Sequence, residues 1–334
     1  MRFRLIGLLV IMSVLLVACG SASQEKVVKK LGEQWGEGKG YELTATMEMK
    51  TGGGEPRAYD VNVWHTKPDF YRVTVTEKND NVTQMIVRNE EGVFVVTPAL
   101  RKTYKFQSEW PKQNSQAYLI GGLAQDLVED KAAVMTEKDG EYIFEAATRN
   151  ADKTGLPSQR VVVDKETMLP KSVVIMDENQ EEKIVIDFKK IDLKVAHKKE
   201  EYAVEKFSEN EEDEVAAADI EDKELQTHYP TVQWENTKLI DEKVVQEDGM
   251  ERVILTFEGD KAYTLMQQPA SSGNSVLPVF APGDLADLGF TIGAITDNSI
   301  SWEKDGVSFF IASTKLTREE MMEVASSMSA GKMK

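Results

Sequence analysis

The stretch YELTATMEMKT, residues 41–51, alternates apolar and polar side chains along its length. Its apolar positions are Tyr41, Leu43, Ala45, Met47 and Met49. Successive side chains of a β-strand point to opposite faces, so this period of two predicts a strand with one buried face and one face in water. The TGGGE segment, residues 51–55, predicts a hairpin turn, because no helix start and no Lys-Ser or Lys-Thr pair follows to make a phosphate-binding loop.

Further short strands follow, most of them separated by polar turns. They are predicted at residues 58–65, 69–77, 83–88, 93–97, 102–106, 142–147, 160–164, 171–176 and 182–187. Two helices are predicted, one over residues 24–35 with Ser23 as its cap and one over residues 114–128. This order of elements predicts an α+β fold, in which a curved antiparallel half-barrel wraps around plug or lid helices.

A run of acids, ENEEDE at residues 209–214, marks a break in composition that is typical of a linker between domains. Beyond it, two predicted hairpins and a helix opened by the capping box Thr317–Glu320 form a small α+β domain. The predicted organisation is a signal peptide at 1–18, a lipidated tether at 19–23, the half-barrel at 24–207, an acidic linker at 208–224 and the small domain at 225–330.

The single cysteine of the chain, Cys19, lies in LLVACGSA, residues 15–22. Arg2 and Arg4 precede an uncharged run over residues 5–18, which is typical of a secretory signal peptide. The alternative is a transmembrane helix, which the run favours less because a span needs about 20 apolar residues. Leu16-Val17-Ala18-Cys19 matches a lipobox, where cleavage leaves the cysteine as the first residue with its sulfur carrying lipid. A buried structural cysteine is the alternative. We therefore predict a lipoprotein held at the extracytoplasmic face of the cell membrane by acyl chains, such as palmitate, on Cys19.

The formal net charge of −17 falls to −19 once residues 1–18 are removed, because they contain Arg2, Arg4 and no acid. Such an acidic surface repels phosphate backbones, so we expect no nucleic-acid partner. It also repels anionic headgroups, so the acyl chains must supply the attachment to the bilayer.

No catalytic or metal motif is present in the sequence. The three histidines, His65, His197 and His228, do not form an HxxxH or HExxH arrangement, and no GxSxG, GxGxxG or Walker pattern occurs. The many carboxylates do not identify a general acid–base pair, because such a pair depends on the fold. The sequence therefore predicts a protein that is not an enzyme and that has no cofactor.

The predicted strands of the half-barrel are rich in methionine and aromatic residues. Methionine adapts to irregular ligands, so a concave apolar face of this composition could hold acyl chains. The alternative, which the residue types favour, is that these side chains pack on the helices. The predicted ligand-binding residues are Met47, Met49, Trp64, Phe70, Tyr71 and Arg72.

Three segments resemble the lipoprotein-carrier fold typified by LolA and LolB. They are KPDFYRVTV at 67–75, NEEGVFVVTPALRKTYKF at 89–106 and VVVDKETMLPKSVVIMDENQEEKIVIDFKKI at 161–191. The shared positions are Pro68, Arg72, Gly92, Asp164, Leu169, Pro170 and Phe188. The resemblance implies an unclosed antiparallel barrel with helices as a lid over an apolar cavity, and an arginine, Arg72, that bonds to the lid.

The C-terminal stretch SISWEKDGVSFFIASTKLTREEMMEVASSM, residues 299–328, resembles a domain of unknown function found in envelope proteins of spore-forming Firmicutes, several of them similar to anti-sigma factors. Together with the lipobox, the whole chain resembles the YdcC-type sporulation lipoproteins of bacilli. The resemblance implies a cell-envelope protein of sporulation. Its predicted function is to bind lipid or acyl chains in the half-barrel cavity. The alternative is a non-catalytic module that binds or senses a protein, either in the manner of an anti-sigma regulator or as a partner in envelope assembly.

Overall fold

The computed structural model describes residues 23–50, 56–79, 82–107, 109–110, 116–149, 156–208, 225–247, 250–271, 278–288 and 291–330. The predictions for the signal peptide, for Cys19, for the TGGGE turn and for residues 209–224 of the acidic linker lie outside these residues.

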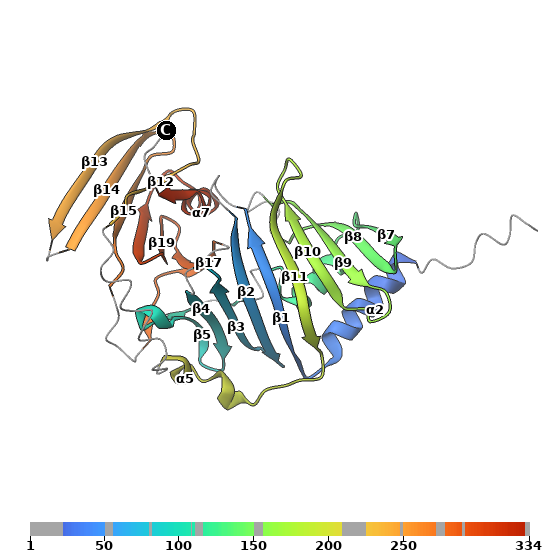
Figure 1. Ribbon diagram of the computed structural model, residues 1–334. Helices are drawn as coiled ribbons and strands as arrows, with labels where there is room; N and C mark the ends of the chain where they lie inside the picture. Colours follow the sequence, from blue (N-terminus) through green and yellow to red (C-terminus); the bar gives the residue numbers. More distant parts are fainter. Residues whose placement is uncertain are drawn as a thin grey trace, which may run out of the picture.

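A strongly curved sheet of twelve strands forms the larger part of the molecule (Figure 1). The strand order is β16-β6-β5-β4-β3-β2-β1-β11-β10-β9-β8-β7, and every pairing is antiparallel except that of β16 with β6. The bounds are β1 (Gly40–Met49), β2 (Arg57–Thr66), β3 (Phe70–Glu77), β4 (Thr83–Asn89), β5 (Gly92–Thr97), β6 (Lys102–Phe106), β7 (Val134–Lys138), β8 (Glu141–Ala147), β9 (Ser158–Asp164), β10 (Pro170–Met176), β11 (Glu182–Asp192) and β16 (Val279–Phe280). The predicted α+β class with a curved antiparallel sheet is confirmed.

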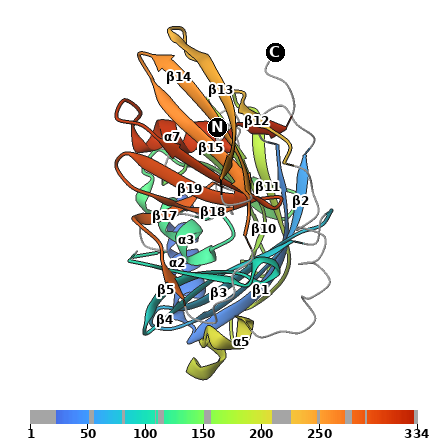
Figure 2. The ribbon, with the colours of Figure 1, turned by 90° about the vertical axis from the view of Figure 1, so that its left-hand side faces the viewer.

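Two helices lie inside the curve of this sheet, α2 (Gln24–Glu37) and α3 (Ile120–Glu129) (Figure 2). The apolar face of α2, which includes Leu31 and Trp35, packs in one core with the odd-numbered residues of β1. The apolar residues alternate in 41–49 because one face of β1 packs against a helix, as the sequence predicts. The predicted strand is confirmed.

The predicted helix boundaries need two corrections. Ser23 precedes α2, but its side chain makes no capping hydrogen bond. Among the described residues the middle helix begins at Ile120, because residues 116–119 form a turn in which the Leu119 amide donates to the Gln116 carbonyl. Residues 114 and 115 of the predicted helix lie outside the described residues.

A second sheet of seven strands contains most of the chain after residue 225, in the order β13-β14-β15-β20-β19-β18-β17. Its strands are β13 (Thr237–Glu247), β14 (Met250–Gly259), β15 (Tyr263–Pro269), β17 (Asp284–Asp287), β18 (Ile292–Ile295), β19 (Ser299–Lys304) and β20 (Val307–Ala312). One face packs on α7 (Arg318–Ser326) and on a two-stranded ribbon of β12 (His228–Pro230) and β21 (Met328–Ala330). The hairpin of β13 and β14 projects from the rest of the molecule (Figure 1).

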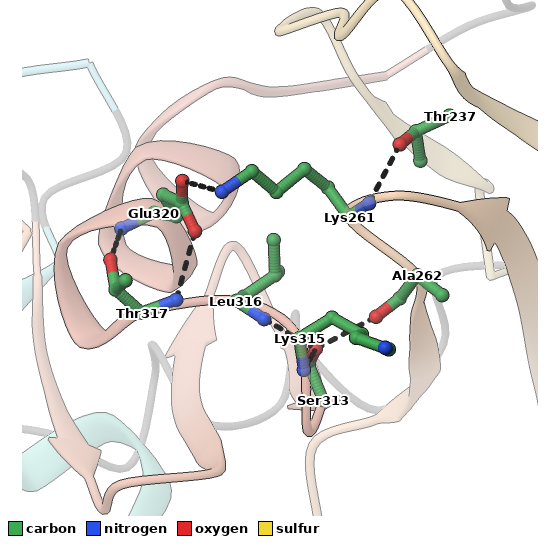
Figure 3. Close-up of polar contacts among 8 residues, drawn as sticks. All are labelled: Thr237, Lys261, Ala262, Ser313, Lys315, Leu316, Thr317 and Glu320. Carbon is green, nitrogen blue, oxygen red and sulfur yellow. Dashed lines mark hydrogen bonds and ion pairs between the residues drawn. The ribbon is translucent and has the colours of Figure 1, made fainter.

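The capping box of α7 is present as predicted (Figure 3). The Glu320 amide donates to the Thr317 hydroxyl at 3.2 Å, and the Thr317 amide donates to the Glu320 carboxylate at 2.9 Å. Lys261 forms an ion pair with Glu320, which attaches the start of the helix to the turn before β15. The helix then buries Met321, Val324 and Ala325.

Short connecting elements complete the described part of the chain. They are η1 (Pro98–Leu100), η2 (Lys199–Tyr202) and α5 (Glu205–Ser208). The segment from η2 to α5 lies on the convex face of the large sheet, where Tyr202, Val204 and Phe207 are buried against β3, β4 and β5.

Candidate functional site

The concave face of the large sheet is covered by the chain's own side chains. Met47 and Met49 are buried on β1 in the core that contains α2 and α3. Trp110 is fully buried in the same core, and its indole donates to Gln116. Leu285 and Ala294, from the second sheet, join this core as well. The interior therefore has the packing of a protein core and not the form of an open chamber.

A small pocket remains at one end of this face, beneath the C-terminus of α2. Its volume is about 90 Å³. Its lining consists of Gln34, Trp35, Gly36, Gly38, Gly40, Tyr41, His65, Lys67, Tyr71, Gly121 and Leu193. A dry cavity of about 150 Å³ is the size that holds a benzene ring. The pocket in this state is therefore smaller than an acyl chain requires.

The glycines at this end allow a close approach between strands. A Cβ on Gly40 would lie 2.2 Å from the His65 carbonyl oxygen, and one on Gly38 would lie 2.6 Å from the Leu193 carbonyl oxygen. By contrast, a Cβ on Gly36 or Gly121 would meet no atom within 4 Å. These two glycines, which both line the pocket, therefore have open space for a side chain.

His65 is one of the titratable residues that line the pocket. Its Nδ1 lies 3.0 Å from the Phe70 carbonyl oxygen and so carries the hydrogen, while its ring stacks on Tyr71 at a centroid distance of 4.2 Å. Burial lowers the pKa of His65, and the nearby Lys67 lowers it further, against the hydrogen bond to Phe70. Burial also raises the pKa of Tyr71 to about 12. The pocket is thus largely aromatic, and its lining side chains are uncharged except for Lys67, whose ammonium donates to the Gly36 carbonyl.

Trp64 and Arg72 lie on the convex face. The guanidinium carbon of Arg72 lies 3.4 Å from the centroid of the Trp64 ring, a cation–π geometry, and the other side of the indole stacks with His197 at 3.6 Å. Burial lowers the pKa of Arg72. Phe70 lies on the same face, in contact with Tyr202.

The six predicted ligand-binding residues therefore do not share one site. Met47, Met49 and Tyr71 face the concave core, and of these only Tyr71 lines the pocket. Trp64, Phe70 and Arg72 lie on the convex side, against the segment that ends at α5. The expectation that Arg72 bonds to the lid helices is wrong, since the sheet lies between Arg72 and α2.

The second sheet is attached to the large sheet at the start of β2. The Arg57 guanidinium bonds to both carboxylate oxygens of Asp305, at 3.1 and 3.5 Å, and to Glu77 at 3.4 Å. Near it, Lys102 forms an ion pair with Glu303.

Backbone contacts reinforce this junction. The two residues of β16 pair with β6, and the Ala281 amide donates to the Lys105 carbonyl at 3.0 Å. The Ile292 amide donates to the Gln84 side chain at 2.9 Å. These contacts could not be predicted from a sequence motif, because the residues that form them lie about 200 positions apart in the chain.

The described part of the chain contains neither a cluster of metal-binding side chains nor a helix that could span a membrane. Among these residues, no three His, Cys, Asp or Glu side chains are arranged to hold a metal ion. Within the same residues, no helix is long and apolar enough to cross a bilayer.

Comparison with known proteins identifies the family. The family described as Sporulation protein YdcC-like matches residues 1–202. Sporulation protein YdcC of Bacillus subtilis is 36% identical over 324 residues, which are 97% of this chain and 95% of that protein. The chain belongs to the YdcC-like sporulation protein family.

Solved structures give a weaker likeness to this YdcC-like chain. The MucA/MucB complex of Pseudomonas aeruginosa is matched over 93% of this chain and 100% of that chain, with 12% identity and a TM-score of 0.34. A LolA superfamily protein from Nitrosomonas europaea is matched over 55% and 98%, with 10% identity and a TM-score of 0.32. TM-scores this low do not support any inference about the function of this chain.

Proposed function

We propose that this YdcC-like chain is a non-catalytic protein of the sporulation envelope that binds another protein through its surface. In this proposal, acyl chains on Cys19 hold it at the extracytoplasmic face of the membrane. The observation that carries the proposal is the occupied concave face, because Trp110, the two internal helices and two residues of the second sheet fill the space in which a carrier would hold lipid.

The same observation favours a rigid binding module over a shuttle. A protein on a lipid anchor stays within a few nanometres of one bilayer. Its second sheet is attached to the large sheet by ion pairs and strand pairing, so both parts present one continuous surface. Such a surface suits the recognition of a neighbouring protein in the envelope.

A photo-crosslinking amino acid placed at two positions of the full chain tests this proposal. The first position is Val244, which is 59% exposed on the projecting hairpin, and the second is Gly121 at the pocket. In sporulating cells we expect discrete protein adducts from Val244 and no lipid adduct from Gly121. Lipid adducts from Gly121 without protein adducts from Val244 would overturn the proposal.

A second candidate function is acyl-chain binding, which the pocket beneath α2 favours. Its lining is largely apolar, and Lys67 supplies a cation at its edge for a carboxylate or phosphate. Binding would require α2 or α3 to move, because the present volume is too small.

The leucine variants Gly121→Leu and Gln125→Leu separate this candidate from the first. Both residues are exposed on α3, but only Gly121 lines the pocket. If the pocket takes acyl chains, Gly121→Leu weakens the binding of fluorescent palmitate at least tenfold and Gln125→Leu leaves it unchanged. Equal binding by both variants would eliminate the pocket as the site.

A further inference from the structure

The described part of the chain starts next to one free edge of the large sheet. Strand β7 is the last strand at that edge. The side chain of Gln24, the first residue of α2, accepts a hydrogen bond from the Met135 amide at 2.9 Å and donates one to the Ala133 carbonyl at 2.6 Å. These two bonds hold the start of α2 directly against the first residues of β7.

The length of chain before this point limits how far the edge can lie from a membrane. Cys19 precedes Gln24 by five residues in the sequence. A fully extended chain spans at most about 3.6 Å per residue, so Gln24 lies within about 18 Å of a lipid-bearing Cys19. The residues that Gln24 holds, on either side of Val134, therefore stay within roughly that distance of the membrane surface, plus the length of the Gln24 side chain.

Apolar side chains are exposed at this end. Val128, at the end of α3, is 42% exposed, and Val134, the first residue of β7, is 59% exposed. Lys131 lies between them in the turn, where its ammonium donates to the Val128 carbonyl. Exposed aliphatic side chains next to lysines are typical of surfaces that rest in the interface of a bilayer.

The local charge also differs from that of the whole chain. The segments 24–30 and 128–138 contain five lysines and four acids, whereas the chain has a net charge of −17. An anionic headgroup layer repels most of this protein but not this end, because only charges within about a Debye length of the surface contribute strongly.

We propose that the end formed by the start of α2, the segment 128–134 and β7 is a membrane-contact face, with Val128 and Val134 inserted among the lipid headgroups. The proposal rests on the proposed lipid anchor at Cys19 and adds an orientation to it. The projecting hairpin of β13 and β14, far from β7 in Figure 1, then points away from the bilayer toward a partner.

Spin labels on the full lipidated chain test this face in vesicles of phosphatidylglycerol and phosphatidylethanolamine. Val134→Cys carries one label and Val244→Cys the matched control, since both valines are 59% exposed and both lie on edge strands. A lipidated Cys19 has no free thiol, so each introduced cysteine is the single labelling site.

We expect the label at residue 134 to become at least threefold less accessible to a water-soluble nickel chelate, and more accessible to oxygen, when the protein passes from detergent into vesicles. The label at residue 244 stays unchanged. Equal aqueous accessibility of both labels, with lipid confirmed on the N-terminal peptide by mass, would overturn the membrane-contact face alone. An N-terminal peptide without lipid would overturn the anchor and the face together.

Discussion

At the scale of single residues, ion pairs contribute to stability according to how deeply they are buried. Arg57 and Asp305 are 30% and 28% exposed, and together they connect β2 of the large sheet to the turn after β19. Lys50 and Glu182, at 42% and 47% exposed, form a surface pair within the large sheet. Water screens the second pair more strongly, so the first has the larger effect on stability.

A double-mutant cycle measures this difference. We expect the pair Arg57→Ala and Asp305→Ala to show a coupling energy of about 1–2 kcal/mol in the free energy of unfolding. The same cycle on Lys50 and Glu182 should give less than about 0.5 kcal/mol. Equal coupling in the two cycles would show that the Arg57 pair does not hold the sheets together.

His65 gives the fold a dependence on pH. Burial lowers its pKa in the folded state below the ordinary value of 6.5, so between these two values the unfolded chain binds more protons than the folded chain. The titration of His65 therefore has little effect on stability above about pH 6.5 and lowers it as the pH drops below that value. His228 acts in the same direction, because burial lowers its pKa too.

Urea unfolding at pH 7.5 and pH 5.5 checks this sign. The free energy of unfolding of the wild-type chain should be lower at pH 5.5 than at pH 7.5. The decrease should be smaller for His65→Gln, because glutamine cannot be protonated. A variant whose loss equals that of the wild type would mean that His65 does not contribute.

Part of the arrangement of the candidate site can be predicted from the sequence. Phe70, Tyr71 and Arg72 are consecutive in a predicted strand, so the period of two already excludes a shared face for all three. By contrast, the pairing of Arg57 with Asp305 could not be foreseen, because it depends on how two sheets separated by 248 positions come together.

At the scale of elements, helix capping depends on whether the cap residue makes its hydrogen bonds. Thr317 and Ser23 both precede helices in the sequence. The Thr317 side chain accepts from the Glu320 amide, whereas the Ser23 side chain makes no such bond to α2.

Substitution by alanine at the two caps should therefore give unequal results. Thr317→Ala is expected to lower the free energy of unfolding by about 1 kcal/mol, and Ser23→Ala by a few tenths at most. Thermal or urea unfolding of both variants is the measurement. A larger loss for Ser23→Ala would contradict the geometry of the two helix starts.

Strands with an apolar pattern, either alternating or continuous, can be predicted from the sequence, and strands without one cannot. Most strands of the large sheet from β1 to β11 lie within about two residues of their predicted positions, because at least one face of each meets a core, and β5 is buried on both faces. Strand β7 was missed because nearly all of its side chains are exposed, and β16 because two residues carry no periodic pattern. Edge strands of this kind take their structure from a neighbour and not from their own sequence.

At the scale of the whole molecule, the two sheets share a core. Leu285 on β17 and Ala294 on β18 pack with residues of the half-barrel. The predicted division into two domains at the acidic linker stays a prediction, and the shared core argues that the two parts unfold together.

Equilibrium unfolding followed by two signals tests this cooperativity. Trp35 and Trp110 report on the large sheet and Trp302 on the second, and all three are buried. We expect tryptophan fluorescence and far-UV circular dichroism to give one coincident transition. Two separated transitions would show that the shared core is too small to couple the sheets.

The central claim is that the interior of the half-barrel is occupied by the protein's own side chains, so that the molecule acts through its surface. Native mass spectrometry of the full chain released from membranes tests it most directly. The account predicts a mass equal to the mature polypeptide plus the lipid on Cys19 and nothing more. A further non-covalent lipid of stoichiometric amount, released only on unfolding, would contradict it.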